Sequence, residues 1–160
     1  RTVASLVAAV RRATRLPLVP KLAPNVPDIK LFVRAAQEAG ADALALINTL
    51  PAMVIDIETR RPVLANKVGG LSGPAIHPVA VKLVWEAAQA ARVPLLAMGG
   101  IVGPEQAIEF LVAGASAVAV GTANFIDPTT PMRVLEGIEA YLRRHGMNAV
   151  AALTGSLRTE

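Results

Sequence analysis

The chain has 160 residues, a formal net charge of +4 and a pI near 10.1, and 53% of its residues are hydrophobic. No hydrophobic run reaches the roughly 18 residues of a membrane span, and without cysteine the chain offers no disulfide, thiolate metal site or cysteine nucleophile. Scattered basic residues and only 3% aromatic residues argue against nucleic-acid binding. The chain opens with no signal peptide and no initiator methionine, so we expect a missing N-terminal part.

The first part of the chain alternates helical and strand patterns. Hydrophobic residues at helical spacing predict a helix over residues 3–13. A strand is expected over residues 16–23, which read LPLVPKLA. Asp28 is the expected N-cap of a helix over residues 28–39, and residues 41–47 form the next strand.

The pattern changes near residue 53. Alternating residues 54–58 and the apolar residues 62–64 predict a β-hairpin inserted into a loop. Asp56 and Glu58 share one face of that hairpin and are expected to be solvated. Residues 66–74, NKVGGLSGP, are expected to form a glycine-rich loop.

The second half repeats the alternation of helix and strand. Strands are predicted over residues 95–98 and 117–120, and each ends in glycine. Proline and glycine residues mark the boundaries of the helices between and around them. These helices are expected over residues 78–91, 104–114, 130–144 and, more weakly, 148–157.

An internal repeat supports this division of the chain. EAGADALAL at residues 38–46 resembles VAGASAVAV at 112–120, and RLPLV at 15–19 resembles RVPLL at 92–96. Each copy contains two strand-helix modules, so four parallel strands are expected. Such an α/β chain is too short for a complete (β/α)8 barrel of about 250 residues. It is therefore part of a barrel, or an open, doubly wound sheet.

All four predicted strands end in polar or glycine residues, and these strand ends meet at the edge where parallel α/β folds bind ligands. Glycine lets backbone N–H groups approach an anion, and two such turns on neighbouring strands predict a phosphate clamp. Ordinary turn formation is the alternative. The strand ends are Lys21, Asn48-Thr49, Gly99-Gly100 and Gly121-Thr122.

The side chains at these ends each have a functional and a structural interpretation. Lys21 could stabilise an anion formed during a reaction, or could simply extend its amine into water. Asn48 suits an amide or carboxylate ligand, or caps a turn. Thr49 and Thr122 are hydroxyl donors or helix caps. His77 is expected to be structural, and no His or Cys cluster predicts a metal site.

Five motifs at these positions together resemble the dihydroorotate dehydrogenases, most closely the class 1B catalytic subunits. The resemblance runs in order from the start of the chain to about residue 142. The INTL and GGLSGPAI segments are specific, whereas MGGI and VGTA also occur in other phosphate-binding barrels. The motifs are KLAPNVPD (21–28), INTL (47–50), ANKVGGLSGPAI (65–76), MGGI (98–101) and VGTAN (120–124).

The resemblance implies a cytoplasmic, FMN-dependent (β/α)8 barrel that oxidises dihydroorotate to orotate in pyrimidine biosynthesis. The chain, residues 1–160, would be the C-terminal half of that FMN-binding barrel domain, with about four βα units and the inserted hairpin. By motif, Lys21 would lie against the flavin and favour its negatively charged reduced form. Asn48 and Thr49 would bind the pyrimidine. The FMN contacts would be Lys21, Ile47, Gly73, Gly99, Gly100, Gly121 and Thr122.

The family's catalytic base is a cysteine in the first half of the barrel, which this sequence lacks. Class 1B membership implies a homodimer with an electron-transfer subunit that carries FAD and a [2Fe–2S] cluster and passes electrons to NAD. No nucleic-acid or membrane partner is expected. The alternatives are a related FMN barrel acting on another pyrimidine, and a non-catalytic phosphate-binding half-barrel.

Overall fold

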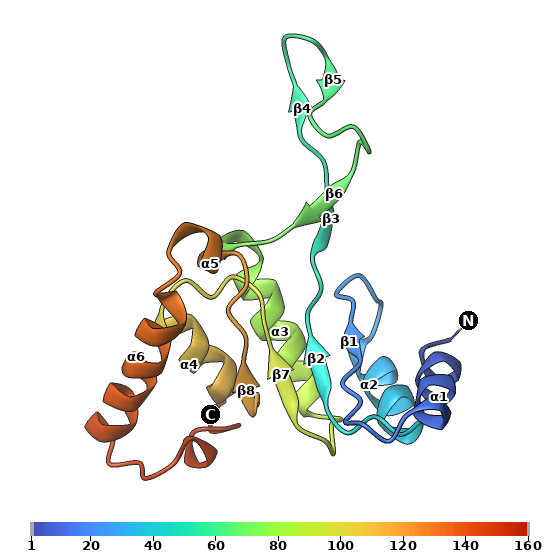
Figure 1. Cartoon of the computed structure of the whole chain (residues 1–160). Helices are drawn as coiled ribbons and strands as arrows, with labels where there is room; N and C mark the ends of the chain where they lie inside the picture. Colours follow the sequence, from blue (N-terminus) through green and yellow to red (C-terminus); the bar gives the residue numbers. More distant parts are fainter. Residues whose placement is uncertain (1, 160) are drawn as a thin grey trace.

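The computed structural model describes residues 2–159. At its centre is a parallel sheet in the order β1-β2-β7-β8 (Figure 1), as the repeat predicts. The order follows the chain without reversal, and right-handed crossovers then place the connecting helices on one face. This winding differs from that of a doubly wound sheet, whose order reverses. The strands are β1 (Lys21–Leu22), β2 (Leu44–Leu46), β7 (Leu95–Ala97) and β8 (Ala117–Val118).

The helices form a row in which α1, α2, α3, α4 and α6 pack successively against one another. The core lies between this row and the sheet, with Phe110, Val84, Val33 and Leu44 fully buried. No helix within residues 2–159 has the length and apolar character needed to cross a bilayer. The helices are α1 (Val3–Ala13), α2 (Ile29–Glu38), α3 (His77–Ala88), α4 (Pro104–Ala113), α5 (Ala123–Ile126) and α6 (Thr130–Arg144), with single 3-10 turns at Pro74–Ile76 and Val150–Ala152.

Residues 50–71 form an arm that projects away from the sheet and helices (Figure 1). At its base, β3 (Leu50–Ala52) pairs antiparallel with β6 (Gly69–Leu71). At its tip, β4 (Ile55–Asp56) pairs with β5 (Arg61–Pro62), which confirms the predicted hairpin.

Several predicted elements differ in extent. Residues 16–23 enter the sheet only at Lys21–Leu22, because Pro17 and Pro20 lack the N–H that a strand ladder needs. The predicted helix over residues 148–157 is wrong beyond the turn Val150–Ala152, since the N–H of Gly155 bonds to the Leu111 carbonyl at 2.9 Å instead of continuing a helix. The expected glycine-rich loop contains β6, and α5 was not expected.

Candidate functional site

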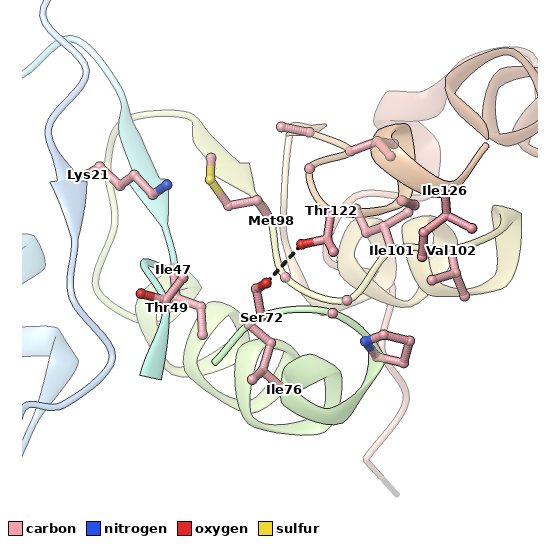
Figure 2. A pocket seen from close by; sticks show the side chains of 18 residues that line it. Lys21, Ile47, Thr49, Ser72, Ile76, Met98, Ile101, Val102, Thr122 and Ile126 are labelled. Atoms are coloured by element: carbon pink, nitrogen blue, oxygen red, sulfur yellow. Dashed lines mark hydrogen bonds between the residues drawn. The ribbon is translucent and has the colours of Figure 1, made fainter. Parts of the chain in front are cut away.

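A cavity of about 280 Å3 lies at the carboxyl ends of the sheet strands. Eight of the nine predicted site residues line it, and Asn48 does not. Lys21 reaches it from β1, Ile47 and Thr49 from the segment after β2, and Thr122 from the turn after β8 (Figure 2), and the glycines follow β7 and β8 or precede α3. The eight are Lys21, Ile47, Thr49, Gly73, Gly99, Gly100, Gly121 and Thr122.

The two glycine turns present unpaired backbone donors at this cavity. Within residues 2–159, the N–H groups of Gly100, Gly121 and Thr122 donate to no acceptor of the chain. Gly99 and Gly100 have φ values of 137° and 71°, which favour glycine. The turns after β7 and β8 thus offer several N–H groups from adjacent strands, an arrangement suited to an anion.

Gly73 and Gly121 border free space in the cavity, where a ligand has room. A Cβ atom built on Gly73 or on Gly121 meets no heavy atom within 4 Å, although both residues line the cavity. Gly100 is different, because a Cβ there lies 2.8 Å from the Gly73 carbonyl oxygen and 2.7 Å from the His77 Cβ. These two turns, Gly99-Gly100 and Gly121-Thr122, are called the cradle below. The cradle is packed against the protein at Gly100 and open to the cavity at Gly121.

Thr122 also takes part in a polar contact across the cavity. Its Oγ1 donates to the Oγ of Ser72 at 2.9 Å, which joins the turn after β8 to the loop before α3 (Figure 2). Ser72 was not among the predicted site residues. Its place in the GGLSGP segment, directly before Gly73, was the available sequence indication.

Lys21 provides the positive charge of the cavity. It is exposed, and among the described residues 2–159 no carboxylate forms an ion pair with its amine. Its side chain points from β1 toward the cavity (Figure 2). A cation held at a strand end without a carboxylate partner can stabilise an anion in the cavity.

The polar residues after β2 take different positions. Thr49 lines the cavity and packs on Gly70, where it leaves no space for a side chain. The Asn48 side chain is exposed, and its backbone N–H donates to the Leu22 carbonyl at 3.1 Å.

The acidic residues of the hairpin lie outside the cavity. Asp56 Oδ1 accepts the N–H groups of Glu58 and Thr59 at 2.9 and 3.2 Å, and these bonds, that from Thr59 first, hold its pKa below the usual 3.8. Asp56 is exposed, as expected, but it closes the hairpin turn. No group of three metal-ligating side chains occurs within residues 2–159.

Comparison with known proteins gives consistent matches. The family model described as dihydroorotate dehydrogenase matches residues 2–142. A protein of Pelobacter propionicus named dihydroorotate dehydrogenase B (NAD(+)), catalytic subunit, is 53% identical over 152 residues, which cover 95% of this chain and 50% of that protein. Proteins of the same name from Geotalea daltonii and Porphyromonas gingivalis are each 52% identical, over 97% and 98% of this chain and 51% of each relative. The chain spans about half the length of these curated relatives.

Proposed function

Because this chain belongs to the dihydroorotate dehydrogenase family, we propose that it forms the FMN-binding, C-terminal half of a (β/α)8 barrel that oxidises dihydroorotate to orotate in pyrimidine biosynthesis. The observation that carries the proposal is the cavity, where the Lys21 amine and two glycine turns with unpaired N–H groups face the same space. A cation and an anion cradle at one parallel sheet edge suit a phosphorylated, redox-active ligand.

The winding of the sheet supports a barrel. Four strands in sequential order, with their helices on one face, have the arrangement of a barrel wall. The edges of β1 and β8 would then pair with strands of the other half. The 50% to 51% coverage of the relatives leaves room for such a half.

The residues fit the phosphate end of FMN. The unpaired N–H groups of Gly100, Gly121 and Thr122 would hold the phosphate, and the open space beside Gly73 and Gly121 would admit it. This is the position at which (β/α)8 barrels commonly bind phosphate, after their last two strands. The cavity volume of about 280 Å3 is near the lower limit for a ligand site, consistent with a second wall from the other half.

FMN would accept the hydride from dihydroorotate C6. In the proposed site, Lys21 stabilises the negative charge that this transfer creates, and Ile47 packs against the cofactor. Thr49 and Asn48 would bind the pyrimidine, with Asn48 on the exposed side that the other half of the barrel would cover. The base that takes the C5 proton would come from the other half of the barrel.

The names of the relatives support further parts of the proposal. They are catalytic subunits of an NAD(+)-linked enzyme, so an electron-transfer subunit carrying FAD and [2Fe–2S] is the expected partner. We propose that the enzyme is a homodimer with this partner and acts in the cytoplasm.

The test is the visible spectrum of the purified full-length protein, followed by anaerobic addition of dihydroorotate. A flavin spectrum that bleaches supports the proposal. Bleaching with dihydrouracil but not dihydroorotate would instead indicate a barrel specific for another pyrimidine, because only dihydroorotate carries the carboxylate. A full-length protein that binds no FMN would contradict the proposal and favour the non-catalytic, phosphate-binding alternative.

A further inference from the structure

His77 is a buried histidine that contacts one of the phosphate turns. It is the first residue of α3, and only 8% of its surface is exposed. Its Nδ1 lies 2.9 Å from the carbonyl oxygen of Gly99. A carbonyl oxygen can only accept, so Nδ1 must carry the proton of this hydrogen bond.

The ring is held from a second helix as well. Its Nε2 is 3.5 Å from Glu109 Oε2 on α4 and has no hydrogen-bond partner in the described chain. The Phe110 ring meets it edge to face, at 4.9 Å between centroids and 84° between planes. These contacts from α4 and from Gly99 leave the ring little freedom to turn, so Nδ1 stays directed at the turn after β7.

The hydrogen bond orients one peptide unit of the cradle. The Gly99 carbonyl and the Gly100 N–H belong to the same planar trans peptide and therefore point in opposite directions. With the carbonyl directed at His77, on the protein side, the Gly100 N–H is directed away from α3. That N–H has no acceptor within residues 2–159, and Gly100 lines the cavity.

We propose that His77 is a positioning residue, whose Nδ1–H bond to the Gly99 carbonyl holds the Gly100 N–H toward the flavin phosphate. This inference rests on the proposed FMN site, and it assigns a role to a residue that does not itself line the cavity. Before any ligand arrives the peptide is already oriented, so binding does not have to order it.

The test compares two nearly isosteric replacements in the full-length protein. His77→Asn keeps an amide donor close to the Nδ1 position, whereas His77→Leu fills the site without a donor. Flavin fluorescence titration should show roughly three- to tenfold weaker FMN binding for His77→Leu, the value of about one hydrogen bond, and little change for His77→Asn. If both variants bind FMN as the unchanged protein does, or both weaken equally, the proposal is wrong. If His77→Leu does not fold, His77→Gln takes its place. The Gln amide lies near the Nε2 position and leaves the Nδ1 position without a donor, so the same weakening of FMN binding is expected.

A second measurement does not depend on FMN. Imidazole 15N spectra of the flavin-free protein should show His77 protonated at Nδ1, and the Gly100 amide signal should move in His77→Leu but much less in His77→Asn. A ring protonated only at Nε2 would overturn the inference. If the unchanged protein binds no FMN, the proposed function fails, and these spectra still decide whether His77 orients the turn.

Discussion

Replacing Gly121 by alanine should impair ligand binding without harming the fold. Its φ is negative, and an added Cβ meets no heavy atom within 4 Å. Alanine at such a position stabilises a protein by about 0.4–1 kcal/mol, because it restricts the unfolded chain. The same methyl group would extend into the cavity and block the phosphate from the N–H groups. Losing one charge-assisted hydrogen bond of about 1.5–3 kcal/mol weakens FMN binding roughly 10- to 100-fold.

Gly100 supplies the matched control. Its φ of 71° costs alanine about 1–3 kcal/mol, and the close approach to the Gly73 carbonyl oxygen and the His77 Cβ adds a similar amount. Gly100→Ala should therefore lose both stability and FMN binding, whereas Gly121→Ala loses only binding. Urea unfolding of the flavin-free protein and fluorescence titration with FMN measure the two effects. Wild-type FMN affinity in Gly121→Ala would refute the cradle, and equal destabilisation of both variants would refute the open space beside Gly121.

Three further changes test other parts of the structure. Lys21→Ala should slow flavin reduction by dihydroorotate roughly 100-fold in stopped flow, with a smaller effect on substrate affinity, and a normal single-turnover rate would contradict the role of its charge. Hydrogen bonds from the side chain and the N–H of Thr129 hold the pKa of Asp127 below its usual 3.8. The stability that this carboxylate contributes is therefore present above pH 3.8, and it is lost as the pH falls through the lower pKa of the folded protein. Urea titrations should show the stability gap between wild type and Asp127→Ala closing below pH 3.8, and a constant gap down to about pH 3 would disprove this. Gly137→Ala gains about 0.5–1 kcal/mol of helix propensity, but the added methyl group has no room beside Pro104. Urea unfolding should therefore show a net loss of stability of roughly 1–2 kcal/mol. A gain in stability would show that α6 can move away from α4.

The helices could be predicted because their boundaries depend on nearby residues. The Asp28 side chain accepts the Lys30 N–H at 2.9 Å, and α4 ends at Gly114, whose φ is 121°. The pairing of β3 with β6 could not be predicted, because it joins Leu50–Ala52 to the glycine-rich Gly69–Leu71 across the whole hairpin. Strand propensity is low for glycine, so local sequence favoured a loop there.

Most of the residues that line the cavity could be predicted from one rule of parallel sheets: the carboxyl ends of the strands meet at one edge. That rule places Lys21, Thr49 and the glycine turns together, and the structure does so. It says nothing about which side chains of the intervening loops face the cavity. The bond from Thr122 to Ser72 and the bond from His77 to the Gly99 carbonyl depend on three-dimensional packing, so only the structure shows them.

The arm couples two walls of the cavity mechanically. Thr49 directly precedes it and Ser72 directly follows it, and both line the cavity. The pairing of Leu50 with Leu71 ties these two ends together, so a restraint on the arm restrains the spacing of both walls. Thermodynamic linkage makes this relation reciprocal. If a molecule that binds the arm changes the affinity of the cavity for its ligand, the ligand changes the affinity of the arm for that molecule by the same factor. The base of the arm therefore holds Thr49 and Ser72 on the walls of one cavity.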